Sequence, residues 1–135
     1  MKTDSLRVNE LPEDAYAWYG EYLAVLDAKD IDAYADFLAP TVELIMNNAE
    51  PVTGRDAVVT GLGEYWKSFG TLEHEPLTIL GSPRAFVLEA LNHYTTLDGR
   101  AVTLRAVAFT DRDDDGLVTS VRLYTDTAPL FEGTG

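Results

Sequence analysis

The spacing of the apolar residues changes once along this chain, near Thr71, and this change restricts the folds that the chain can adopt. Before Thr71 they mostly recur every three or four positions, as on one face of an α-helix; after it they alternate with polar residues, as in β-strands. The helical patterns cover 12–28, 30–39 and 54–69. The alternating patterns cover 42–47, 72–80, 85–96, 101–110 and 117–127. Helices followed by antiparallel strands predict an α+β fold, with the helices on one face of a curved sheet.

The composition is that of one globular domain, expected to span 1–135, with 46% hydrophobic residues and a core of its own. The first ten residues are polar, lack the apolar core of a signal peptide and are expected to form a flexible tail. Cysteine is absent, which excludes disulfides, thiolate nucleophiles and cysteine-ligated zinc. This absence fits a cytoplasmic location.

The chain is strongly acidic, with 10 Lys and Arg against 23 Asp and Glu and a formal net charge of −13. Such a surface repels phosphate backbones and anionic lipid, so neither nucleic acid nor a membrane is expected as a partner. No apolar run is long enough to span a bilayer. No phosphate-binding loop, nucleophile triad spacing or metal-ligand motif occurs, so no cofactor and no metal are expected.

A lone carboxylate, Asp126, interrupts an aromatic, strand-like segment near the end of the chain. Burying an unpaired acid costs several kcal/mol, on the order of the known transfer penalties. Two interpretations remain open. Asp126 is a structural residue paired with Arg122 or with the backbone, or it is a general acid/base that reaches a pocket where the strand bulges or curls.

Strand pairing decides which side chains share a face. If Asp98-Gly99 is a two-residue hairpin loop, His93 pairs with Leu104. Glu89, His93 and Leu104 then face the helices, whereas Asn92 faces away. A tight turn at 81–84 brings His74 to the same face as His93. The helices contribute Tyr22 and Trp66 to the pocket that this arrangement predicts.

Asn48 is a further candidate, because it follows the first strand and shares a face with Met46. It either orients a water or a carbonyl group in the pocket or simply belongs to a turn. Gly61 and Gly63 weaken the third helix, which indicates either a close backbone approach or plain tolerance.

Short segments in a fixed order resemble the SnoaL-like branch of the nuclear transport factor 2-like superfamily. These segments are 22–34, 36–40, 54–57, 98–99 and 115–126. The resemblance implies a cone-shaped roll that encloses one pocket for a small hydrophobic substrate, commonly in a homodimer. Similar proteins include polyketide cyclases, ketosteroid isomerases and limonene epoxide hydrolase, which use acid/base chemistry without cofactors.

The resemblance also implies residue roles. Asp126 matches the last-strand aspartate that serves as acid/base in the cyclases, and Asn48 matches an asparagine that holds the attacking water in the epoxide hydrolase. The hydrolase's arginine and second aspartate are missing from the segment 89–92, and the isomerase's first-strand base appears as Leu44 or Ile45.

We therefore expect a cofactor-independent cyclase or isomerase for a small hydrophobic carbonyl compound, with Asp126 as proton shuttle and help from His93 or His74. The predicted substrate-binding residues are Tyr22, Asn48, Trp66, His74, Glu89 and Leu104. Two alternatives are a non-catalytic ligand-binding or scaffold protein and an epoxide hydrolase that pairs Asp126 with Glu89.

Overall fold

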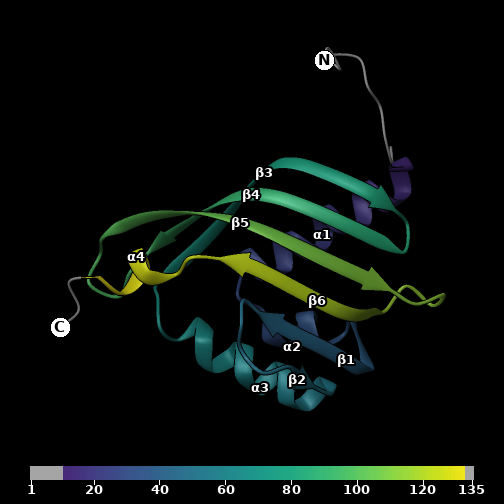
Figure 1. Cartoon of the computed structure of the whole chain (residues 1–135), viewed down its shortest axis with the longest axis horizontal. Coiled ribbons are helices and arrows are strands. Elements are labelled where there is room, and N and C mark those ends of the chain that lie inside the picture. The colour runs from purple at the N-terminus through teal and green to yellow at the C-terminus, as the bar shows by residue number, and fades with distance from the viewer. Residues whose placement is uncertain (1–10, 133–135) are drawn as a thin grey trace, which may run out of the picture.

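The computed structural model describes residues 11–132, which form a curved six-stranded sheet with helices packed over its inner face (Figure 1). The predicted tail at 1–10 lies outside the described residues. The helices are α1 (Glu13–Asp27), α2 (Ile31–Ala35), α3 (Arg55–Trp66) and α4 (Ala128–Phe131). The strands are β1 (Leu38–Met46), β2 (Val52–Thr53), β3 (Thr71–Ser82), β4 (Ala85–Thr95), β5 (Ala101–Arg112) and β6 (Val118–Thr125). The predicted α+β class is confirmed.

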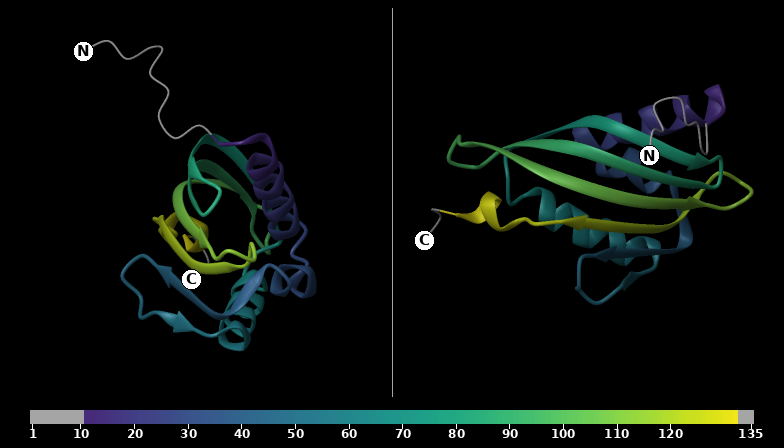
Figure 2. Two further views of the ribbon diagram at one scale, coloured as in Figure 1. Left: turned by 90° about the vertical axis from the view of Figure 1, so that its right-hand side faces the viewer. Right: turned by 45° about the horizontal axis from the view of Figure 1, so that its top comes forward.

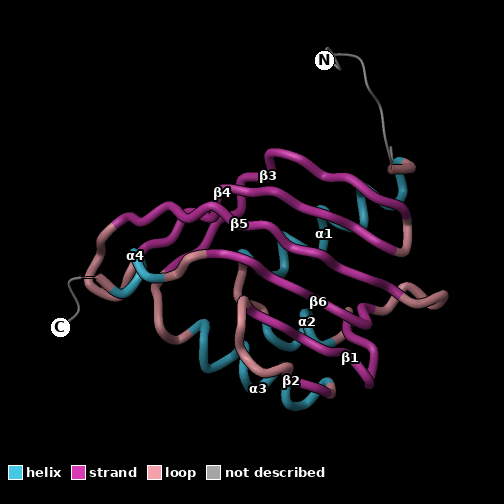
Figure 3. The backbone as a smooth tube through the Cα atoms, in the orientation of Figure 1, coloured by secondary structure: helices cyan, strands magenta, loops and turns pink. Residues whose placement is uncertain are grey.

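The sheet has the order β2-β1-β6-β5-β4-β3, and its pairs are antiparallel except β1 with β6. Figure 3 shows the long strands crossing the molecule side by side. Viewed along the strands, the sheet curls into a partly closed roll (Figure 2, left). The helix α1 packs against β3 and α3 packs against β1, so the two helices cover the concave face. A cone of this kind leaves an interior between helices and sheet.

Aromatic side chains fill much of that interior. Tyr19 and Tyr22 on α1 and Tyr34 on α2 are each at most 2% exposed. At one end of the roll the guanidinium of Arg112 lies 4.2 Å from the ring centre of Trp18 and 5.2 Å from that of Phe86. A cation over two aromatic faces is attracted to their electron density. This stack joins the last residue of β5 to α1 and β4.

The strand β1 begins earlier than its alternating pattern predicts. Leu38 already pairs with Val118 of β6, and the pairing shifts before Glu43. Pro40 lies within this shift, where a missing backbone N–H costs no ladder hydrogen bond. The short elements β2 and α4 were not predicted from the sequence.

The β4–β5 hairpin has a longer loop than predicted, and this changes the face of every residue on β4. The hydroxyl of Thr96 contacts the Asp98 carboxylate and accepts a hydrogen bond from the Arg100 N–H at 2.9 Å. Gly99 adopts a positive φ of 89°. Three residues, 97–99, therefore form the loop in place of two.

The consequence is a shift of one residue in register. His93 pairs with Thr103, and Asn92 pairs with Leu104. A one-residue shift moves a whole strand's side chains to the other face. The prediction that Glu89 and His93 face the helices is therefore wrong, and Asn92 faces inward in their place. The inward face predicted for Leu104 on β5 is correct, and Leu104 is buried.

A Cβ atom added at Gly61 or Gly63 would meet nothing within 4 Å. Of the two interpretations of these helical glycines, plain tolerance is the one that the structure supports.

Candidate functional site

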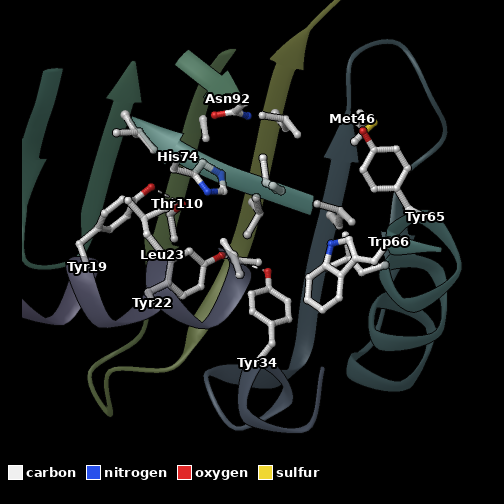
Figure 4. A pocket seen from close by; sticks show the side chains of 18 of the residues that line it. Tyr19, Tyr22, Leu23, Tyr34, Met46, Tyr65, Trp66, His74, Asn92 and Thr110 are labelled. Carbon is white, nitrogen blue, oxygen red and sulfur yellow. Dashed lines mark hydrogen bonds between the residues drawn. The ribbon is translucent and has the colours of Figure 1, made fainter. Parts of the chain in front are cut away.

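A cavity of about 90 Å³ lies between the helices and the concave face of the sheet. The helices line it mainly with the aromatic residues Tyr19, Tyr22, Tyr34, Tyr65 and Trp66. The sheet contributes aliphatic side chains together with His74, Asn92, Tyr94 and Thr110 (Figure 4). A mostly apolar enclosure with a few convergent polar groups is typical of a small-molecule site.

The tyrosines of the cavity are neutral hydrogen-bonding groups. Burial raises the pKa of Tyr34 to about 12 and raises the pKa of Tyr22 well above its ordinary value. Their hydroxyls lie 3.0 Å apart, and the Tyr19 hydroxyl lies 3.5 Å from Oγ1 of Thr110. These three hydroxyls form hydrogen bonds with one another or with a threonine. They are the polar groups that α1 and α2 contribute to the cavity lining, and they keep their protons at neutral pH.

His74 is held by a carboxylate from another element. Asp27, the last residue of α1, places Oδ1 2.5 Å from Nδ1 of the His74 ring. The same carboxylate oxygen accepts the backbone N–H of His74 at 3.1 Å. The His74 side chain is 12% exposed and the Asp27 side chain 28%. The carboxylate holds the ring through Nδ1, which leaves Nε2 as the ring nitrogen that a ligand can contact.

A second polar group comes from β4 and α3. Asn92 is 3% exposed, and its Oδ1 accepts no hydrogen bond from any residue between 11 and 132. The Tyr65 hydroxyl is also buried without a hydrogen-bond partner in this part of the chain. Burial raises the pKa of both Tyr65 and Tyr94. The Tyr65 and Asn92 side chains each act to lower the pKa of Tyr94, so Tyr94 is the polar neighbour that the two groups share.

The cavity lining at the ends of β1 and β6 is half-buried. This holds for Met46 and Leu123, which pair with each other there, and for Tyr65 on α3.

Three of the predicted site residues line the cavity: Tyr22, Trp66 and His74. Leu104 is buried opposite Asn92 but is not part of the lining. His74 lies on the predicted face although it pairs with Asn92, not with Leu91.

The two other candidates on the sheet lie on its convex face, outside the cavity. Nε2 of His93 lies 2.8 Å from a carboxylate oxygen of Glu75, and Nδ1 lies 2.9 Å from the Thr103 hydroxyl. Glu89 is exposed and accepts a hydrogen bond from Thr78 at 2.9 Å. The register shift of β4 is the physical reason for both positions.

Asp126 is exposed, directly after the last residue of β6, and it is not part of the lining. Its Oδ1 accepts the backbone N–H of Ala128 at 3.0 Å, as in the backbone-paired interpretation of this residue. Asn47 fixes this end of the strand, because its amide donates to the Thr125 carbonyl at 2.7 Å and accepts the Thr125 N–H at 2.9 Å. Asn48 is exposed in the turn after β1. The strand therefore ends before Asp126 can turn inward.

Sequence reasoning missed Asp27 and Tyr65 and placed Asn92 on the wrong face. Asp27 lies 47 residues from its partner His74, so no local spacing connects them. The available signal for Tyr65 is its position next to Trp66 in the third helical pattern. For Asn92 the signal is a polar residue in the row of Leu88 and Ala90.

No three side chains of the types that bind metal ions come together within 11–132. In the same range no helix is long and apolar enough to cross a membrane.

The SnoaL-like domain family matches residues 19–121 of this chain. No curated protein matches. Among solved structures, an NTF2-like protein of unknown function from Burkholderia pseudomallei is 17% identical, with a TM-score of 0.77, over 89% of this chain and 96% of that chain. An LEH-like epoxide hydrolase from M. tuberculosis is 21% identical, with a TM-score of 0.72, over 90% of this chain and 91% of that chain. The epoxide hydrolase/cyclase-like enzyme SalBIII, which has a role in pyran ring formation in the polyether salinomycin, is 14% identical, with a TM-score of 0.74, over 84% and 92%.

Proposed function

Because this chain belongs to the SnoaL-like domain family, we propose that it is a cofactor-independent acid/base enzyme, a cyclase or isomerase, for a small and largely apolar carbonyl compound. The observation that carries the proposal is His74, which lines an apolar cavity while Asp27 holds its Nδ1 at 2.5 Å. An imidazole that is held through one ring nitrogen can take a proton with the other.

The chemistry begins at a C–H bond next to the carbonyl group. Nε2 of His74 takes this proton, and the electron pair of the C–H bond moves to the carbonyl oxygen to give an enolate. In an isomerase the imidazolium returns the proton to a different carbon. In a cyclase the enolate carbon attacks a second carbonyl group, and the imidazolium protonates the new alkoxide. Both routes return His74 to its starting state.

Tyr65 is the donor that we assign to the enolate oxygen. Its hydroxyl is buried, unpartnered within the described residues, and neutral because burial raises its pKa. A hydrogen-bond donor that is already in place where negative charge develops lowers the barrier without reorganisation.

The proposal is tested by proton exchange, since the natural substrate is not needed for it. Cyclopentanone fits a small apolar cavity, and loss of its α-protons in heavy water is followed by proton NMR. Replacing His74→Gln should reduce the protein-catalysed exchange rate by roughly 10²–10⁴-fold, the usual contribution of general acid–base catalysis. Asp27→Asn should reduce it as well, because it removes the negative charge beside the ring and can present an N–H to Nδ1, which favours the wrong tautomer.

The matched controls use the same substitutions outside the cavity. The sequence has two histidines, so His93→Gln is the control for His74→Gln, and Asp126→Asn is the control for Asp27→Asn. Both controls should exchange at the wild-type rate. If Asp126→Asn loses activity while His74→Gln keeps it, Asp126 is the proton shuttle, as the family resemblance implies, and His74 is not the base. Loss of activity in His93→Gln with none in His74→Gln would likewise rule out His74 as the base.

A second candidate is a ligand-binding protein without chemistry. The specific observation in its favour is that the Asp27–His74 contact also ties the end of α1 to β3, a role that such a protein would need. Unchanged exchange in His74→Gln together with a less stable fold would favour this candidate. The third candidate, an epoxide hydrolase that pairs Asp126 with Glu89, gains no support, because neither carboxylate lines the cavity.

We also propose that the protein works in the cytoplasm as a homodimer formed through the convex face of the sheet. The absence of cysteine fits that compartment. On the convex face Tyr124 is 47% exposed and packs edge-on against Phe109, with ring centres 6.1 Å apart. Val107 pairs with Tyr124 beside them. Half-exposed aromatic residues on a sheet face are typical of interface cores.

A further inference from the structure

Asn92 is the polar group of the cavity that the acid/base chemistry does not use. Its side chain is 97% buried, yet its carbonyl oxygen has no donor among residues 11–132. A buried acceptor without a donor costs free energy in the folded protein. Such groups in native proteins need an explanation, and a bound ligand is one.

The neighbouring strands cannot supply the missing donor. On β3 the partner of Asn92 is His74, whose Nδ1 is held by Asp27. On β5 the partner is Leu104, which has no polar side-chain atom. Figure 4 shows Asn92 on the cavity side of the sheet, in the same space as His74, with Tyr65 on the α3 side of that space. Tyr94, two residues further along the same strand, interacts with the Asn92 side chain, but its hydroxyl donates no hydrogen bond to Oδ1. The acceptor is therefore available to a ligand in the cavity.

Asn92 and Tyr65 have complementary needs. The Asn92 oxygen lacks a donor, whereas the Tyr65 hydroxyl is a neutral donor that lacks an acceptor. Apart from the Tyr94 hydroxyl, the lining on the sheet side includes apolar residues such as Leu72, Leu88 and Leu123. A ligand that satisfies both groups carries a hydroxyl group and a carbonyl group on one small hydrocarbon frame.

We propose that the cavity selects a hydroxylated carbonyl compound, whose O–H donates to Oδ1 of Asn92 while its carbonyl oxygen accepts from Tyr65. The inference rests on the proposed function for the assignment of the carbonyl group, but the hydroxyl subsite stands on Asn92 alone. Asn92 is then a specificity-determining residue. A site built to bind a hydroxyl group discriminates strongly against analogues that lack it.

The test measures binding, not turnover. Cyclopentanol offers a hydroxyl donor, and cyclopentanone offers only an acceptor on the same five-carbon ring. Their dissociation constants are measured by NMR titration of the wild-type protein and of Asn92→Leu, which keeps the volume but removes the acceptor. The affinity for cyclopentanol relative to cyclopentanone should fall about tenfold in Asn92→Leu, the usual effect of one unpaired buried polar group.

Two further variants keep the test decisive. Asn92→Ala removes the amide without adding new atoms, so it should lower the same ratio if Asn92→Leu fails to fold. Asn48→Leu changes an exposed asparagine and should leave the ratio unchanged. A change of less than about twofold in both Asn92 variants, or an equal change in Asn48→Leu, overturns the proposal.

The outcome is independent of the exchange assay. If Asn92→Leu loses the preference for cyclopentanol while His74→Gln exchanges protons at the wild-type rate, the hydroxyl subsite is supported and His74 is not the base. If Asn92→Leu keeps the preference while His74→Gln loses proton exchange, His74 is supported as the base and the hydroxyl subsite is ruled out.

Discussion

Two asparagines show how differently the same residue type is used in this chain. Asn47 has a positive φ of 52° and makes two hydrogen bonds with the backbone of Thr125, so its amide replaces a strand partner at the end of β6. Asparagine is among the few residues that tolerate this backbone conformation. Asn92 sits in regular strand geometry, and its carbonyl oxygen has no donor in the described chain. The first asparagine stabilises the fold, and the second weakens it.

The residue-level prediction is that equal substitutions at these two positions change stability in opposite directions. Asn92→Leu should raise the free energy of unfolding by about 1 kcal/mol, because it removes an unpaired buried acceptor. Asn47→Leu should lower it by roughly 2–4 kcal/mol, because two hydrogen bonds are lost and leucine is strained at positive φ. Urea unfolding of both variants measures the difference. A loss of stability at Asn92 as large as that at Asn47 would make Asn92 a structural residue.

At the level of elements, the β4–β5 hairpin decides which residues reach the cavity. The alternation of β4 and β5 is plain in the sequence, and the inward face of β5 was predicted correctly. The register was not, because it depends on whether the Thr96 hydroxyl joins the loop by bonding to Asp98 and Arg100. Such a side-chain contact leaves no periodic signal. Because the loop has one residue more than predicted, the register of β4 shifts by one, and Asn92 faces the cavity in place of His93.

The element-level prediction compares two glycines. Gly99→Ala should destabilise the protein by about 1–2 kcal/mol, since this loop position has a φ of 89°. Gly61→Ala should stabilise it by up to about 1 kcal/mol, because Gly61 is in the middle of α3 and the added methyl group meets nothing within 4 Å. Thermal unfolding of the two variants gives the comparison. If both variants shift the unfolding temperature equally and in the same direction, backbone conformation does not determine the effect of alanine at these two positions.

At the level of the whole molecule, the fold could be predicted from the sequence and much of the site could not. The order of helices and strands is written in local periodicity, which each segment carries by itself. The site depends on contacts between distant segments. Asp27 meets His74 across 47 residues, and Asp126 is left outside because Asn47 stops β6 at Thr125. The sequence therefore identifies residues that are able to do chemistry, but it does not determine which of them lie in the cavity.

The whole-molecule prediction concerns assembly. Light scattering should give the mass of a dimer for the wild-type protein, and Tyr124→Glu should give a monomer, because it places a charge on the convex face. Each chain carries a net charge of −13, so added salt should tighten the dimer by screening repulsion between the copies.

The control for assembly is Tyr16→Glu. Tyr16 is 60% exposed on α1, away from the convex face, and its replacement should leave the mass of a dimer. A wild-type mass of one chain at every salt concentration would contradict the assembly that we propose.

The stack of Arg112 on Trp18 and Phe86 has one last consequence. It joins the last residue of β5 to α1 and β4, and none of the three residues lines the cavity. A change in this stack should therefore alter the stability of the fold without touching a bound molecule directly.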